Sequence, residues 1–212
     1  MKESKIKKQI EASIAVKRLL LGDSALISLI DTWAELCTLS LRAGGKVVFC
    51  GNGGSFADAQ HLSAEFTSRF LFDRPGLASI ALGTNSSAMT AIGNDYGYVN
   101  VFSREIEAVV TDNDILIALT TSGNSPNILK ALEAAEKIGV PTLVLTGETG
   151  GSLPKSVPMI KVPSTDTARV QESHILVGHI ICEIVESNMF ETLATAENIK
   201  ELEKKRSSAI KD

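Results

Sequence analysis

The run Lys46-Val47-Val48-Phe49-Cys50-Gly51-Asn52-Gly53-Gly54-Ser55 decides how this chain folds. Its first half is short, apolar and rich in β-branched residues, which is typical of a buried strand. Its second half is a glycine-rich turn, and a helical pattern of small residues follows at once. A strand, a glycine turn and a helix start present backbone N–H groups and the positive end of a helix. The run therefore predicts a site for an anion or a polar ligand, with Ser55 at the helix N-cap.

His61 and Glu65 follow on the helix predicted over residues 55–71 and are four positions apart. This spacing places both side chains on one helix face. An imidazole and a carboxylate on one face can transfer protons or ligate a metal ion. Such pairs are also common on the exposed faces of helices, so the pair alone leaves both interpretations open.

The composition indicates one globular domain of the α/β class. The chain has 212 residues, 44% of them hydrophobic but only 5% aromatic, which favours α/β architecture over an all-β sandwich. The net charge is −4 and the body of the chain has no strong basic run, so we expect no nucleic-acid partner.

The cysteines and the N-terminal residues point to a reducing compartment. Cys37, Cys50 and Cys182 are widely spaced and odd in number, which fits buried free thiols better than disulfides or a metal site. Residues 1–8 are polar and lysine-rich, and no run of about 18 apolar residues occurs. We therefore expect a cytoplasmic protein without a membrane span.

Short apolar runs alternate with helical patterns from Lys46 onward. The predicted strands cover residues 47–50, 77–82, 114–119, 141–145 and 158–162. The predicted helices after the first strand cover residues 55–71, 98–110, 125–138 and 168–189. Continuous apolar strands alternating with helices predict a parallel sheet that is covered on both faces. Ligands bind such sheets at the carboxyl ends of the strands, near a switch in strand order.

Two amphipathic helices, over residues 3–20 and 24–43, precede the first strand. Their apolar faces either pack on the domain or form a helical bundle between subunits. After Phe190 the chain becomes charged, with few large apolar residues. We therefore predict one domain over residues 1–212. Its parts are N-terminal helices (1–44), a core (45–190) and a charged helical tail (191–212).

The predicted third strand ends in Thr120-Thr121-Ser122-Gly123-Asn124-Ser125, and Pro126 begins the next helix. Hydroxyls and backbone N–H groups crowd this helix N-terminus, where the helix dipole adds partial positive charge. The arrangement suits a phosphate or a sugar. A capped turn is the alternative, but the loop has more hydroxyl and amide groups than a cap needs.

Other polar residues lie at Gly93-Asn94-Asp95, which is a turn or a contact for sugar hydroxyls, and on the last predicted helix. There Gln171 and His179 are about 80° apart around the helix axis and broadly share a face. His174 lies at a different angle, and we expect it to be structural. Four side chains make a plausible nitrogen and oxygen ligand set for zinc or another divalent ion, namely His61, Glu65, Gln171 and His179.

Together these motifs resemble the bacterial phosphoheptose isomerases of the sugar isomerase (SIS) domain superfamily. The resemblance covers most of residues 1–190, in order and with similar spacing, although the tail looks longer than is usual there. It rests on residues 50–55, His61 with Glu65, residues 93–95, 121–125 and 145–147, Arg169-Val170-Gln171-Glu172 with His174, and His179.

The resemblance implies a three-layer, doubly wound, flavodoxin-like fold with a five-stranded parallel sheet. It also implies a homotetramer with active sites between subunits and a bundle of N-terminal helices. The implied reaction converts sedoheptulose 7-phosphate to D-glycero-D-manno-heptose 7-phosphate through an enediol. Its product would feed heptose synthesis for a surface polysaccharide such as lipopolysaccharide or capsule.

The resemblance also implies roles for single residues. One zinc ion per subunit would be held by His61, Glu65, Gln171 and His179, and would either polarise the carbonyl or hold the site together. Glu65 would be the base and His179 the second acid/base. Thr120, Thr121, Ser122 and Ser125 would cradle the phosphate, and Arg69 would approach a neighbouring site. The remaining contacts to the sugar would come from Asn52, Gly53, Gly54, Ser55, Glu65, Asn94, Asp95 and Gln171.

Other functions stay open. One is a non-catalytic adaptor with the SIS fold that binds a replication initiator, and a related one is a protein that only binds phosphosugars. The presence of both Glu65 and His179 favours the enzyme, because that adaptor family lacks the acid/base pair. A sugar-phosphate-sensing regulator would usually carry a DNA-binding domain, and none is visible. An isomerase for another sugar phosphate is the remaining alternative.

Overall fold

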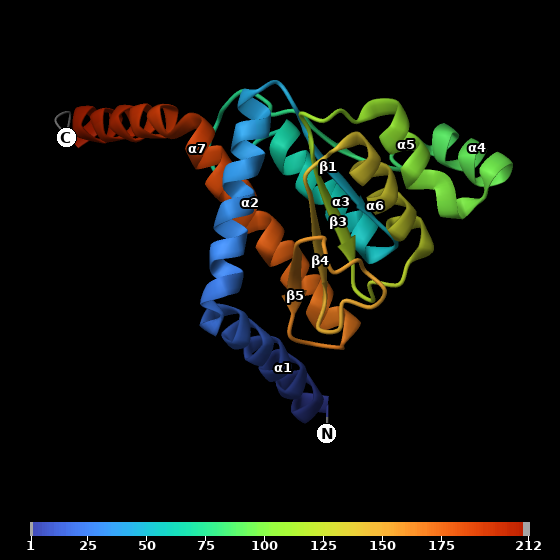
Figure 1. The fold of residues 1–212 in the computed structure, drawn as a ribbon. Coiled ribbons are helices and arrows are strands. Elements are labelled where there is room, and N and C mark those ends of the chain that lie inside the picture. Colours follow the sequence, from blue (N-terminus) through green and yellow to red (C-terminus); the bar gives the residue numbers. More distant parts are fainter. Residues whose placement is uncertain (1, 210–212) are drawn as a thin grey trace.

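The computed structural model describes the backbone of residues 2–209 and the side chains of residues 4–190. Helices and strands alternate along most of the chain, as Figure 1 shows. In chain order the elements are α1 (Lys2–Gly22), α2 (Ser24–Arg42), β1 (Val47–Gly51), α3 (Gly54–Thr67), β2 (Ser79–Ala81), α4 (Ser86–Tyr96), the 3₁₀ turn η1 (Tyr98–Asn100), α5 (Val101–Val109), β3 (Ile115–Thr120), α6 (Pro126–Ile138), β4 (Thr142–Gly147), β5 (Met159–Val162) and α7 (Thr167–Ala209).

The five strands form one parallel sheet in the order β2-β1-β3-β4-β5. This order confirms the predicted doubly wound, flavodoxin-like sheet. From β1 the chain first moves to β2 on one side and then crosses back to β3 on the other. The strand order therefore switches between β1 and β3, and a ligand crevice forms at the carboxyl ends of these strands.

Side chains of each strand alternate between two apolar clusters, one on each face of the sheet. Phe49 and Ile117 pack with α2, α3 and α7, whereas Val48 and Leu116 pack with α5 and α6. Both faces are therefore covered, which explains why the strands read as continuous apolar runs in the sequence. In Figure 1, α5 and α6 lie on one side of the sheet and α2 and α7 on the other.

The start of α3 differs from the prediction. Gly53, not Ser55, is the N-cap residue, and Ser55 is buried in the first helical turn. The chain bends at Gly53 with a φ of 56°, a conformation that glycine adopts without strain. The N-cap of α3 therefore falls two residues earlier than predicted, inside the glycine-rich turn. The other end of α3, at Thr67, also comes earlier than residue 71.

The segment around Gly93-Asn94-Asp95 is helical, although the sequence suggested a turn. It lies in the last part of α4, which the sequence reading missed. Asn85 caps this helix by accepting the N–H of Ala88 at 3.2 Å, and Gly97 ends it with a φ of 83°. Further on, the helix predicted over residues 98–110 consists of the turn η1 followed by α5.

The long helix α7 changes direction at Phe190, whose backbone is non-helical (φ −135°, ψ 19°). The helix then continues to Ala209, within the stretch that the sequence assigned to a charged helical tail. Residues 210–212 of that stretch lie outside the described residues. The proposed division into helices, core and tail stays a prediction.

Among the described residues, α2 is long and apolar enough to cross a membrane by length and composition alone. The core helices of soluble proteins pass the same test. Ile30, Trp33 and Cys37 of α2 are buried in the cluster that covers the sheet. Packing on this core thus accounts for one apolar face of α2, while Ile27 and Leu39 are exposed.

Candidate functional site

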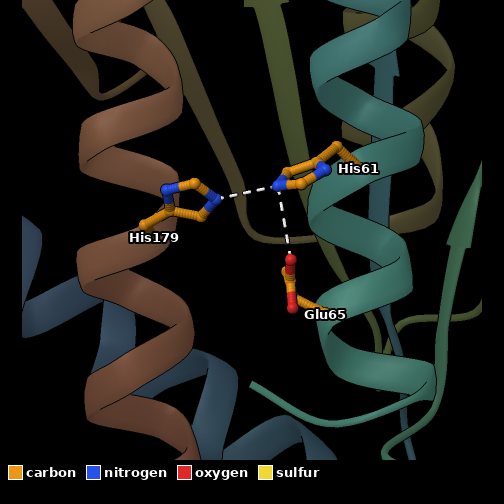
Figure 2. Close-up of side chains that lie close together, drawn as sticks. All are labelled: His61, Glu65 and His179. Carbon is orange, nitrogen blue, oxygen red and sulfur yellow. Dashed lines mark hydrogen bonds and ion pairs between the residues drawn. The ribbon is translucent and has the colours of Figure 1, made fainter. Parts of the chain in front are cut away.

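Three side chains from two helices converge beside the sheet. His61 and Glu65 extend from α3 and His179 from α7, and Figure 2 shows the three pointing toward one another. The Nε2 atoms of the two histidines are 2.9 Å apart, and Glu65 Oε1 lies 3.3 Å from His61 Nε2. The structure thus joins residues that are 118 positions apart in the sequence.

The site is closed on one side and open on the other. His179 is half-buried and its ring stacks on Phe70 at a centroid distance of 5.5 Å, whereas the His61 side chain is 51% exposed. Burial is the largest influence on His179 and lowers its pKa. The neighbouring His61 lowers this pKa further, and the Glu65 carboxylate only partly offsets the two effects. The lowered pKa of His179 favours the neutral imidazole, the form that a metal ligand or a general base needs.

The three side chains fit a zinc ion by their chemistry. Their ligand atoms all lie within 4.8 Å of one another. Zinc binds imidazole nitrogen and carboxylate oxygen at about 2.0–2.2 Å in a tetrahedron, which places neighbouring ligand atoms roughly 3.3 Å apart. Two imidazole nitrogens at 2.9 Å also need a shared proton or a cation between them.

Gln171, the fourth predicted ligand, lies against the first turn of α3. A Cβ atom added to Gly54 would be 2.5 Å from Gln171 Nε2. A side chain at this position would have to displace the amide, so Gln171 and the glycine-rich turn are in close contact. Metal ligation by Gln171 stays a prediction.

The turn after β1 is tied to the start of α6 by a pair of amides. Asn52 and Asn127 exchange hydrogen bonds of 2.9 and 2.8 Å, and the Tyr98 hydroxyl donates to Asn52 Oδ1 at 3.0 Å. These residues, with Ser125, line a cavity of about 400 Å³. The pair spans β1 and β3, the strands between which the order switches. The sequence reading missed Tyr98 and Asn127; the nearest signal was that Asn127 adjoins the predicted phosphate loop.

The hydroxyls of the loop after β3 have different surroundings. Thr120 is buried and its hydroxyl accepts the N–H of Gly123 at 3.2 Å, while Ser122 accepts the N–H of Asn124 at 3.2 Å. Ser125 is the N-cap residue of α6, but its hydroxyl makes no capping hydrogen bond. Helix capping therefore does not account for Ser125, and its hydroxyl can bind a ligand at the helix N-terminus.

Most of the remaining predicted residues are exposed, whereas His174 is buried. Asn94 and Asp95 are exposed at the end of α4 and hydrogen-bond each other at 2.7 Å. Arg69 is exposed beyond the end of α3, and Thr121 is half-buried in the loop after β3. His174 is fully buried, and burial lowers its pKa to about 4. A neutral, buried imidazole agrees with the structural role expected for His174.

A buried ion pair joins α7 to the segment that follows α3. Arg74 Nε donates to Glu186 Oε1 at 2.7 Å, and both side chains are 1% exposed. The same carboxylate accepts the N–H groups of Phe70 and Leu71 at 2.8 and 2.7 Å. No sequence pattern indicated this pair, whose members are 112 positions apart.

Known proteins resemble this chain in both sequence and structure. A family model described as "SIS domain" matches residues 17–147. A phosphoheptose isomerase from Aneurinibacillus thermoaerophilus is 50% identical over 186 residues, which are 87% of this chain and 94% of that protein. Solved structures of phosphoheptose isomerases from Neisseria gonorrhoeae and Francisella tularensis superpose with TM-scores of 0.81 and 0.83. They are 38% and 36% identical, and each match covers 88% of this chain and 99–100% of the other.

Proposed function

This chain belongs to the phosphoheptose isomerases of the SIS domain family, and on this premise we propose that it interconverts sedoheptulose 7-phosphate and D-glycero-D-manno-heptose 7-phosphate. The protein is an aldose–ketose isomerase. The convergence of His61, Glu65 and His179 is the observation that supports this chemistry in the chain itself. A carboxylate and a neutral imidazole side by side are what a proton transfer between neighbouring carbons requires.

In the proposed reaction Glu65 removes a proton from C1 of the ketose, and the bond electrons form the C1–C2 double bond of an enediol. His179 transfers the hydroxyl proton from the oxygen on C1 to the oxygen on C2. Glu65 then returns a proton to C2, and the carbonyl group is left at C1. No atom is gained or lost and no external oxidant is needed. The open side of the site, at His61, gives the substrate access.

We propose that the phosphate is bound at the N-terminus of α6 by Thr121, Ser122 and Ser125, with Thr120 shaping the loop. The uncommitted hydroxyl of Ser125 supports this assignment. The sugar hydroxyls would then face Asn52 and the turn of Gly53, Gly54 and Ser55, with Gln171 close by. Asn94, Asp95 and Arg69 are proposed as further contacts, from the exposed end of α4 and from the segment after α3.

We propose one zinc ion per subunit, held by His61, Glu65 and His179, with Gln171 as the fourth ligand. When bound, zinc polarises the substrate carbonyl or fixes the three side chains in place. The neutral state of His179 suits it for such a bond.

We also propose a homotetramer in the cytoplasm, as the family resemblance implied. The support in the structure is α1, which carries a row of apolar side chains that are at least 43% exposed, at Ile6, Ile10 and Ile14. This row is spaced by one helical turn and needs a partner surface.

The alternative function, a non-catalytic adaptor, leaves the convergence of Glu65 and His179 unexplained.

The proposed function is tested by incubating the purified protein with sedoheptulose 7-phosphate in deuterated water and recording NMR spectra. We expect the aldose phosphate to appear and to carry deuterium at C2, because the enediol exchanges protons with the solvent. A folded, zinc-loaded protein that forms no aldose phosphate would refute this substrate. Parallel incubations with pentose and hexose phosphates would then identify another sugar phosphate as the substrate. If none of them is converted, a protein that only binds phosphosugars is the remaining alternative.

A further inference from the structure

The pair Arg74–Glu186 occupies the junction between the two helices that carry the proposed catalytic residues. Glu186 lies on α7 seven residues after His179, which is about two helical turns. Arg74 lies nine residues after Glu65, in the segment that connects α3 to β2. Each side chain is 1% exposed, so the pair is shielded from water.

Arg74 binds the end of α3 through its guanidinium group. Nη2 donates to the carbonyl of Glu65 at 2.8 Å, and Nη1 donates to the carbonyl of Phe66 at 2.8 Å. The last carbonyls of a helix have no partner within the helix, and a cation there also complements the helix dipole. Arg74 therefore fixes the backbone of the very residue that is proposed as the base.

Glu186 fixes the segment that follows α3. Its two oxygens accept the N–H groups of Phe70 and Leu71, at 2.8 and 2.7 Å. Phe70 in turn stacks its ring on His179. One carboxylate thus holds Arg74 with one oxygen and sets the position of the ring that supports His179.

We infer that Arg74 and Glu186 are positioning residues that fix the Glu65 backbone and the His179 ring relative to each other. The inference rests on the proposed function, because it concerns the geometry of that same site. A buried ion pair is weak evidence for stability on its own, since burial of the charges costs about as much as their attraction gains. Here Arg74 donates to the backbone carbonyl of Glu65, the proposed base. Glu186 accepts the backbone N–H of Phe70, whose ring stacks on His179.

Two substitutions separate positioning from folding. Glu186→Gln keeps the shape of the side chain but removes the charge that holds Arg74 and the two N–H groups. Phe70→Leu leaves the ion pair intact and removes only the ring against His179. Since Phe70 is half-buried, the leucine variant keeps an apolar side chain there and is expected to fold. The matched control is Glu133→Gln, which breaks the exposed ion pair with Lys130 on α6.

The measurements are kcat and KM for sedoheptulose 7-phosphate, and the affinity and visible absorption spectrum with Co²⁺ in place of zinc. All are taken well below the melting temperature of each full-length variant, which circular dichroism establishes. We expect kcat to fall about 10- to 100-fold in both variants, with KM within about threefold of wild type, because displaced groups lose rate more than binding. The Co²⁺ spectrum should change in both, while Glu133→Gln should match wild type.

Either variant overturns the inference if it is folded and keeps both wild-type kcat and the wild-type Co²⁺ spectrum. If Glu186→Gln does not fold, Phe70→Leu alone decides the question in the same way. A wild-type protein without turnover would refute the proposed substrate, and the Co²⁺ spectra would then decide on positioning. A wild-type protein that binds no Co²⁺ would refute the metal site, and kcat would decide.

Discussion

Gly178 of α7 and Leu62 of α3 are in direct contact where the two helices cross, next to His179 and His61. A Cβ atom on Gly178 would lie 2.5 Å from Leu62 Cδ2 and 3.0 Å from Leu62 Cγ, and Leu62 is fully buried. Ordinary carbon contacts are about 3.5–4.0 Å, so even one methyl group must push the helices or the leucine aside. The absence of a side chain at Gly178 thus leaves room for Leu62 between the two helices.

The first prediction is that Gly178→Ala destabilises the protein, by about 1–3 kcal/mol, as overpacking of a core does. This is measured by urea denaturation. The double variant Gly178→Ala with Leu62→Ala should lose less than the sum of the two single losses, because the added methyl group then has room. Additive losses would show that the two side-chain positions are not coupled.

The second prediction concerns Glu65, the proposed base. Glu65→Gln keeps the size of the side chain but cannot accept the C1 proton, so kcat should fall by about 10²–10⁴-fold. Binding of the substrate, measured by isothermal titration calorimetry, should remain. Glu107→Gln, at an exposed position on α5, is the control. Turnover that survives in Glu65→Gln would assign the base to another residue.

The third prediction concerns the loop after β3, where the phosphate is proposed to bind. Replacing Ser122 and Ser125 by Ala should raise KM for the phosphorylated sugar by about tenfold or more, as expected for the loss of two hydrogen bonds to a charged group. The change in kcat should be smaller. Ser156→Ala, at an exposed position before β5, is the matched control. An unchanged KM in the double variant would move the phosphate away from α6.

The fourth prediction concerns Tyr98, whose hydroxyl donates a hydrogen bond to Asn52 Oδ1 in the cavity that both residues line. Tyr98→Phe keeps the ring and should raise KM several-fold, since a hydrogen bond is worth about 0.5–1.5 kcal/mol. Its melting temperature should stay near that of wild type, because Tyr98 is exposed. Tyr96→Phe, whose ring lies over Arg104, is the control. Equal KM values for the two variants would exclude Tyr98 from substrate binding.

The fifth prediction is a pH dependence of stability that is set by Asp114, a buried carboxylate just before β3. Burial alone would raise its pKa. Hydrogen bonds from the Lys46 side chain and from the backbone N–H groups of Thr111 and Lys46 outweigh burial, so the pKa lies below its ordinary value. A carboxylate with a lowered pKa stabilises the fold above its unfolded pKa of about 4. This stabilisation is lost as the pH falls through the folded pKa.

The test of this prediction is urea denaturation between pH 7 and pH 3. We expect Asp114→Asn to be less stable than wild type at pH 7 and the difference to shrink as the pH falls. The exposed Asp112 offers the control Asp112→Asn. A difference that stays constant over this range would mean that the charge of Asp114 does not contribute.

Much of the fold could be predicted from the sequence because its signals are local. Runs such as Val47–Cys50 are apolar over their whole length, and they became the strands of a sheet that is covered on both faces. The helix spacing of His61 and Glu65 likewise placed them on one face. Local patterns did not show which residue caps a helix. Gly53, and not the predicted Ser55, is the N-cap of α3.

Long-range partners could not be predicted in the same way. The sequence around Arg74 does not indicate Glu186 as its partner, and the sequence around Asn52 does not indicate Asn127. Both pairs depend on how distant segments are arranged in the fold. The convergence of His61 and His179 was expected from the family resemblance and not from their separation in the chain. Each of the two pairs that the sequence missed links a loop residue to a helix that is distant in the sequence.

Because α7 follows the five strands in the described part of the chain, these elements are translated in a fixed order. All five strands have been translated by Val162, whereas Gln171, His179 and Glu186 come later. A nascent chain can therefore align its whole sheet while it still lacks the second histidine and the carboxylate that holds Arg74. The cluster of His61, Glu65 and His179 therefore stays incomplete until α7 has been translated.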